Sequence, residues 1–221
     1  NNMSLKLING LFYAEFELQN IDNQSVIDEV TDIYLNKNAR MTDELDDSRP
    51  HRDEVDVQHT FYEDCPITET LKAKFATEIS KITNNNFGEN SYGLEEIWGH
   101  FTPPLGYTMV HDHAGGCDEG SGYQLSWVYY PHQPKNAGNI NFIVNANEAR
   151  VSYEVPIKSG HLYLFSSSLL HFVPRNASGQ NRVSISGNLI PNPQFVEVIK
   201  DDDDYTNNFW YFLGRNEKLL R

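Results

Sequence analysis

Residues 160–186, with the sequence GHLYLFSSSLLHFVPRNASGQNRVSIS, indicate the architecture more clearly than any other part of the chain. Short runs rich in β-branched and aromatic residues alternate here with clusters of Ser, Pro, Asn and Gly, which is typical of short strands joined by turns. Pro174, Asn176, Ser178 and Gly179 lie between two such runs and predict a hairpin loop. The strands on either side of this loop are therefore expected to be antiparallel neighbours.

The same pattern of short β-branched and aromatic runs separated by turn residues begins near Tyr92 and continues to about residue 200. Eight candidate strands can be assigned, at residues 107–111, 123–130, 140–144, 151–155, 161–165, 169–173, 182–189 and 195–199. Short strands at such regular spacing are typical of β-sandwiches and barrels, and a jelly roll is one way to close them. The sequence therefore predicts a mainly β fold.

The first part of the chain has a different pattern. Residues 24–35 and 66–82 carry apolar side chains at helical spacing, which predicts two amphipathic helices. The polar, acidic stretch 42–63 between them is expected to be a long surface loop of the kind that often borders a site. We expect one domain over residues 1–221, with a helical cover at about 1–90, a β core at about 91–200 and a C-terminal tail at 201–221.

Composition excludes several classes of function. The 221 residues carry 31 acidic against 17 basic side chains and a formal charge of -14, which argues against binding to a phosphate backbone. No stretch approaches the 18 or more apolar residues of a membrane span, and no basic and apolar leader opens the chain, so a cytoplasmic location is expected. Cys65 and Cys117 form no CxxC pair and indicate neither a zinc site nor a disulfide.

The run of Asp at 201–204 is expected to be a solvated loop.

His111-Asp112-His113 is the first candidate for chemistry. At the end of a strand, the period of two places both imidazoles on one face and Asp112 on the other. His171, at the end of another predicted strand, is the best-placed third ligand, and imidazoles suit iron, zinc, copper or nickel. A short HxH pair by itself also fits a purely structural role, as does each of the other five histidines, which have no second histidine at i+2.

Arg182 and Ser184 follow His171 across the predicted hairpin loop. If residue 171 lies opposite 182 or 184, Arg182 points into the same cavity as the metal. A lone arginine would more simply lie at the rim of the barrel. Beside a metal site, however, its planar guanidinium suits the far carboxylate of a five-carbon diacid whose 2-oxo acid end chelates iron.

Five motifs together resemble a known family. They are His111-x-His113, Ser126-Trp127-Val128-Tyr129-Tyr130, Gly160-x-Leu162-x-Leu164-Phe165, His171-x-Val173-x-Arg175-Asn176 and Arg182-Val183-Ser184-Ile185-Ser186. The chain is similar over about residues 96–190 to an uncharacterised family of Fe(II)- and 2-oxoglutarate-dependent oxygenases related to prolyl hydroxylases, and Leu7 to Phe12 fits the start of that family more weakly.

The resemblance implies a double-stranded β-helix, similar to a jelly roll or cupin, with N-terminal covering helices. It implies Fe(II), O2 and 2-oxoglutarate, which is converted to succinate and carbon dioxide as a substrate C–H bond is oxidised. By position, His111 and His171 would be metal ligands, Arg182 and Ser184 would hold the far carboxylate, and Tyr130 matches the second tyrosine of an assisting Tyr-Tyr pair. The primary substrate, a protein or a small molecule, is not identified by the motifs. The acidic loop at 42–63 could favour a basic substrate, although the same charges are explained equally well by their effect on solubility.

His113 departs from the wider superfamily, which places Asp or Glu at this position. Three neutral imidazoles would leave the iron more positive, unless Asp118 or Glu119 folds back from the Gly-rich stretch 115–122. The missing carboxylate keeps a second enzyme class open, a three-histidine cupin-type dioxygenase or isomerase that needs no 2-oxoglutarate. A third reading is a metal-free jelly-roll binding module, in which the histidines line a pocket.

Overall fold

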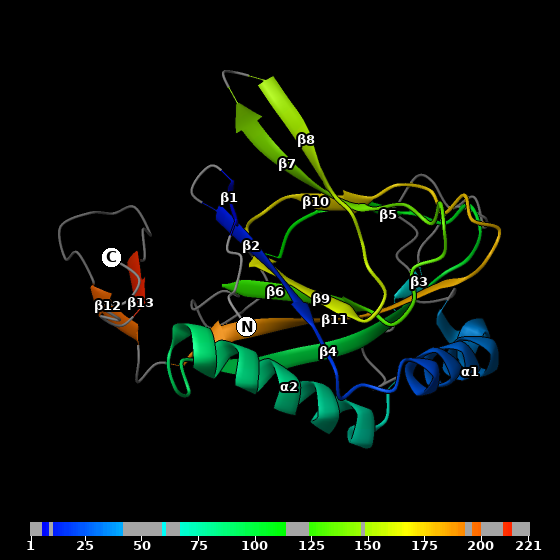
Figure 1. Cartoon of the computed structure of the whole chain (residues 1–221), viewed down its shortest axis with the longest axis horizontal. Helices are drawn as coiled ribbons and strands as arrows, with labels where there is room; N and C mark the ends of the chain where they lie inside the picture. The colour runs from blue at the N-terminus through cyan, green and yellow to red at the C-terminus, as the bar shows by residue number, and fades with distance from the viewer. Residues whose placement is uncertain are drawn as a thin grey trace.

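Two antiparallel sheets pack face to face in the computed structural model, with two helices beside the larger sheet (Figure 1). The structure describes residues 6–8, 11–41, 59–60, 67–113, 124–146, 149–192, 196–199 and 210–213. The expected loop residues 42–58 and 61–63, both cysteines, Asp118, Glu119 and the Asp run at 201–204 lie outside these ranges.

The seven-stranded sheet forms the floor of the sandwich and has the order β1-β2-β9-β6-β11-β4-β3. Its strands are β1 (Lys6–Ile8), β2 (Leu11–Glu17), β9 (His161–Ser166), β6 (Leu125–Tyr130), β11 (Arg182–Pro191), β4 (Tyr92–Thr102) and β3 (His59–Thr60). The opposing sheet has the order β5-β10-β7-β8, with β5 (Thr108–His111), β10 (His171–Val173), β7 (Ile140–Ala146) and β8 (Ala149–Val155). β12 (Val196–Ile199) and β13 (Trp210–Leu213) pair in a separate two-stranded ribbon.

This arrangement confirms the predicted mainly β, double-stranded β-helix class. All eight expected strands are present, with shifted ends. The N-terminal part is not purely a helical cover, because β1, β2 and β3 precede residue 90 and join the large sheet.

The central strands are buried on both faces. Their successive side chains point alternately into two separate hydrophobic cores. Every residue of β6 is buried. Trp127 and Tyr129 pack with the helices, whereas Val128 and Tyr130 belong to the core between the sheets. The odd-numbered Val183 and Ile185 of β11 likewise face the helices. The even-numbered residues of β11 are therefore left to line the space between the sheets.

The two predicted helices are confirmed as α1 (Asn23–Met41) and α2 (Glu69–Phe87). The Asp22 carboxylate accepts hydrogen bonds from the backbone N–H groups of Gln24 and Ser25 at the start of α1, and Thr68 caps α2 through the N–H of Leu71. Within the described ranges, neither helix has the length and apolar content that a membrane crossing requires.

The predicted hairpin between residues 173 and 182 is wrong, because β10 and β11 lie in different sheets. Asn176, fully buried between them, explains the geometry. Its side-chain amide donates to the carbonyl oxygens of Thr102, Pro103 and Gln180 at 3.2, 3.3 and 2.7 Å, while its backbone pairs with Leu105 and Gly106. The turn residues therefore build a crossover from one sheet to the other, packed beside the crossover from β4 to β5.

Candidate functional site

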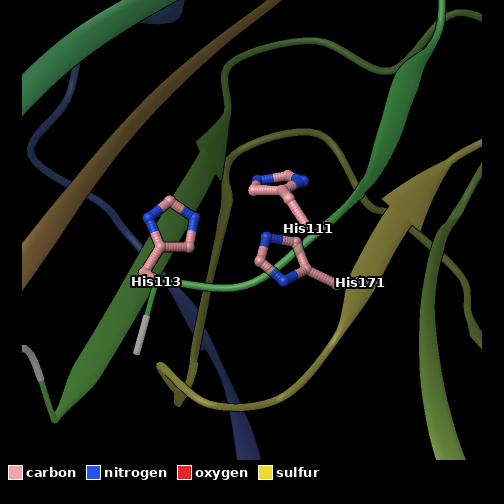
Figure 2. A group of neighbouring side chains, drawn as sticks. All are labelled: His111, His113 and His171. Atoms are coloured by element: carbon pink, nitrogen blue, oxygen red, sulfur yellow. The ribbon is translucent and has the colours of Figure 1, made fainter. Parts of the chain in front are cut away.

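Three histidines converge, two from the opposing sheet and one just after its strand β5 (Figure 2). His111 ends β5 and pairs with His171 of β10, while the backbone N–H of His113, two residues after β5, donates to the Ser167 carbonyl at 2.9 Å. One ring nitrogen from each of the three lies within 4.8 Å of the others. The ring centroids of His111 and His171 are 4.2 Å apart, and His113 lies 5.0 Å from His111 and 5.3 Å from His171.

Backbone carbonyls orient two of the rings. His111 Nδ1 lies 2.8 Å from the Met109 oxygen, and His171 Nδ1 lies 2.8 Å from the Leu169 oxygen. A carbonyl can only accept, so each Nδ1 carries the hydrogen and each Nε2 keeps its lone pair. This is the usual outer-sphere support of metal-binding histidines, and the residues present therefore fit a divalent metal ion.

Burial favours the neutral form of His113 and His171, which is the form of imidazole that binds metal. Burial, with a contribution from His111, lowers the pKa of His113 to about 4 and that of His171 well below its usual value. The ring of Phe165 lies 4.8 Å from that of His171 and supplies part of this apolar environment. Asp112 is exposed and is not one of the converging residues, as the alternation predicts. No carboxylate among the described residues joins the three imidazoles.

Arg182 is the second notable group, because it is a buried cation. The residue is only 2% exposed, and burial lowers the pKa of its guanidinium. Its Nη1 donates to the Ala137 carbonyl at 2.5 Å. Its Nε has no hydrogen-bond partner among the described residues, and neither does the hydroxyl of Thr102, which lies opposite on β4. A buried guanidinium whose Nε is unpaired, beside a hydroxyl without a partner, is suited to receive an anion.

Arg182 and the histidines share the space between the sheets, and β4 shows how they are related. Trp98, His100 and Thr102 lie opposite Ser186, Ser184 and Arg182 of β11. The Trp98 ring lies 6.0 Å from that of His113 at one end of this row, and Arg182 stands at the other. The row therefore leads from the metal cluster to the guanidinium.

His100, in the middle of the row, was expected to be a surface or core histidine. Trp98 Nε1 donates to its Nε2 at 2.7 Å. Burial and the nearby His111, Arg182 and His113 lower its pKa to about 3. His100 is thus a neutral residue that faces both groups. Its signal in the sequence is the period-two run Trp98-x-His100-x-Thr102, which puts polar atoms on one face of a buried strand.

The remaining predicted residues lie on the same inner face. Ser184 is buried opposite His100, and Tyr130 is 3% exposed within the core between the sheets. Burial raises the pKa of the Tyr130 phenol, and Arg182 opposes this shift. Tyr129 points the opposite way, where its hydroxyl donates to the Asn23 side chain. The structure therefore brings all six predicted site residues to the space between the sheets.

No protein-family model matches the chain, and no curated protein sequence does either. Solved structures do resemble it. A prolyl-4-hydroxylase of Pseudomonas putida is 18% identical, with a TM-score of 0.52 over 81% of this chain and 92% of that one. The non-haem alpha-ketoglutarate-dependent carbocyclase SnoK from nogalamycin biosynthesis is 14% identical, with a TM-score of 0.62 over 94% of this chain and 85% of that one.

The epimerase SnoN, solved in complex with Fe3+, alpha-ketoglutarate and nogalamycin RO, is 15% identical. Its TM-score is 0.53, over 81% of this chain and 78% of that one. These similarities extend over most of each chain at low sequence identity, so they describe the fold. The chain has the double-stranded β-helix fold found in non-haem iron, 2-oxoglutarate-dependent oxygenases.

Proposed function

We propose that this chain is an Fe(II)- and 2-oxoglutarate-dependent oxygenase, most simply a hydroxylase of an unidentified protein or small-molecule substrate. One observation carries this proposal: a buried guanidinium without an acidic partner among the described residues faces the same space between the sheets as three convergent imidazoles. A metal site alone would not need Arg182, and an anion site alone would not need the histidines. A chelating diacid uses both.

His111, His113 and His171 are the proposed metal ligands. The carbonyls that hold Nδ1 of His111 and His171 direct the Nε2 lone pairs inward before any ion binds. This preorganisation reduces the entropy lost on coordination. The exposed Asp112 takes no part in this set.

Arg182 is the proposed partner of the far carboxylate of 2-oxoglutarate, with the hydroxyls of Thr102 and Ser184 as neighbouring donors. From Ser186, opposite Trp98, to Arg182 the strand advances four residues, or roughly 13 Å at about 3.3 Å per residue. That length accommodates an extended five-carbon diacid between the metal cluster and the guanidinium. Tyr130 and His100 flank this path as neutral hydrogen-bonding groups, and we assign both to positioning.

When bound, the iron and 2-oxoglutarate would couple release of succinate and carbon dioxide to insertion of one oxygen atom of O2 into a substrate C–H bond. The chain itself orients these groups and excludes water from them. No nucleophile or acid–base pair of the protein is required. Burial lowers the pKa values of His100, His113 and His171 and so favours their neutral forms, which do not compete as proton donors.

Succinate formation without a primary substrate tests this function. The purified chain is incubated with Fe(II), ascorbate and 2-oxoglutarate, and succinate is quantified. We expect slow turnover that is lost in His171→Ala and in Arg182→Ala and kept in Arg175→Ala, an exposed arginine on the same crossover. If 2-oxoglutarate is neither bound nor consumed by the iron-loaded protein, this function is refuted.

The three-imidazole set favours a second candidate, a dioxygenase or isomerase that needs no 2-oxoglutarate. Arg182 separates the two. An iron-loaded protein that consumes O2 with a substrate in the absence of 2-oxoglutarate, and keeps this activity in Arg182→Ala, would favour the second candidate. A protein without affinity for Fe(II) or Mn(II) would instead indicate a metal-free binding module.

A further inference from the structure

The charge balance of the site differs from that of a site with a carboxylate ligand. His111, His113 and His171 contribute no charge as neutral ligands, and no described carboxylate joins them. Arg182, which faces the same space from the opposite sheet, carries a buried positive charge without an acidic partner among the described residues. A divalent ion entering this site would raise the local charge to +3, because nothing described there offsets it.

We propose that the metal ion and an anionic chelator bind to this site as a coupled pair, and that His113 is the residue that makes the coupling strong. This inference rests on the proposed function and deepens it. With Asp at position 113, the chain itself would supply one negative charge to the metal. With His113, the first negative charge must come from the ligand.

The expected coupling follows from the number and position of the charges. A dianion would place one carboxylate at the metal and the other at Arg182, so that the local charge falls from +3 to +1. The bound dianion therefore reduces the repulsion between the metal ion and Arg182, and the bound metal ion attracts the dianion. Thermodynamic linkage requires each partner to raise the affinity of the other by the same factor. Charges interact strongly at Arg182 and His171 because both side chains are buried, and the buried rings of Phe165 and Trp98 lie beside His171 and His113.

A matched pair of variants isolates the charge at position 113. His113→Asp and His113→Asn introduce side chains of nearly equal size that differ by one unit of charge. Both remove an imidazole, so any loss of ligand geometry is common to the two. A difference between them reports the charge alone.

Mn(II) binding provides the readout, because free Mn(II) can be measured directly by electron paramagnetic resonance without turnover. The metal is titrated alone, with saturating 2-oxoglutarate, and with 2-oxobutanoate, which chelates but has no far carboxylate. For the unmodified chain we expect 2-oxoglutarate to tighten Mn(II) binding about 10- to 100-fold, within the usual range for coupled sites. We expect 2-oxobutanoate to have a smaller effect.

In the variants, His113→Asp should bind Mn(II) alone more tightly than His113→Asn, and its coupling to 2-oxoglutarate should be about tenfold weaker. Equal coupling in the two variants would overturn the role of charge at this position. Independent binding of Mn(II) and 2-oxoglutarate to the unmodified chain would overturn the coupling but leave the proposed oxygenase function standing. If either one fails to bind at all, both are overturned.

Two further variants test the source of negative charge. Asp112→Asn removes an exposed carboxylate outside the ligand set and should leave the coupling unchanged. The double variant Asp118→Asn, Glu119→Gln removes the acids closest to the ligands in sequence beyond His113. If this double variant weakens binding of Mn(II) alone by more than about tenfold, a carboxylate completes the site and the inference is wrong.

Discussion

Replacing Arg182 by Met should stabilise the ligand-free protein, although Arg182 is among its largest buried side chains. Removing a buried residue usually destabilises a fold. Here the side chain carries a charge with no acidic partner among the described residues, and its Nε donates to no acceptor there. Methionine fills a similar volume and has no charge to desolvate.

Two opposing terms determine the magnitude. The variant loses the hydrogen bond from Nη1 to the Ala137 carbonyl, worth about 1.5–3 kcal/mol for a charged donor. It also removes the desolvation penalty of a buried ion, which is several kcal/mol after relaxation. The second term is the larger, so we expect a net gain of about 1–3 kcal/mol in the free energy of unfolding. In a chain of this length each kcal/mol raises Tm by about 2–4 °C.

Urea unfolding of the two proteins, with and without metal and 2-oxoglutarate, tests both halves of the expectation. At a ligand concentration 100 times its Kd, the unmodified protein should gain about 2.7 kcal/mol, whereas Arg182→Met should gain almost nothing from 2-oxoglutarate. Arg175→Met is the control, since that side chain is exposed and lies over the Tyr107 ring, and it should change stability by less than about 1 kcal/mol. A ligand-free Arg182→Met protein less stable by more than about 1 kcal/mol would show that the guanidinium is structural, and the reasoning would fail.

Three other outcomes are expected. The pKa of His100 is about 3 in the folded protein and 6.5 in the unfolded chain, so between these values only the unfolded state takes up the proton. Stability should therefore decrease as the pH is lowered below 6.5. In urea titrations His100→Asn should reduce this loss by about 1.2 kcal/mol between pH 6 and 5. Asn176→Ala removes the buried amide that donates to the carbonyls of Thr102, Pro103 and Gln180, and it should lower the free energy of unfolding by about 2–4 kcal/mol. An undiminished urea midpoint would contradict the anchoring role of this amide. Gly138 has φ +86, and a Cβ there would lie 2.8 Å from the Pro174 oxygen, so Gly138→Ala should lower the free energy of unfolding by about 1–3 kcal/mol. Gly179 has φ +73 but no atom within 4 Å of such a Cβ, so Gly179→Ala should lower the free energy of unfolding by less in the same assay.

Eight strands could be predicted because their signal is local, whereas β4 (Tyr92–Thr102) was not assigned. Short runs rich in β-branched and aromatic residues mark β7, β9 and β11, and apolar side chains at helical spacing mark the two helices. The strand Leu11–Glu17 was missed because it lies within the stretch assigned to the helical cover, although, like β6, it is covered on both faces. Phe12 and Phe16 pack on the helix side and Tyr13 packs between the sheets, so the apolar pattern is nearly continuous and does not alternate.

The hairpin was mispredicted because turn residues specify a change of direction and not a partner strand. Pro174, Asn176 and Gly179 are as suitable for a crossover between sheets as for a hairpin. The choice is made by contacts with the Thr102 and Pro103 carbonyls, more than 70 residues away in sequence. His100 was undervalued for a related reason, since its relation to Arg182 depends on the pairing of β4 with β11.

The predicted site residues come together although the predicted hairpin is wrong, and the crossovers explain why. His111 and His171 lie on β5 and β10 of one sheet, whereas Thr102 and Arg182 lie on β4 and β11 of the other. The crossovers that join these strands run side by side and are tied together by the Asn176 amide and by its backbone bonds to Leu105 and Gly106. One buried residue, which faces neither the metal cluster nor the anion site, thus holds the two sheets in register. A hairpin would have related Arg182 to His171 alone, whereas the paired crossovers fix both halves of the site at once.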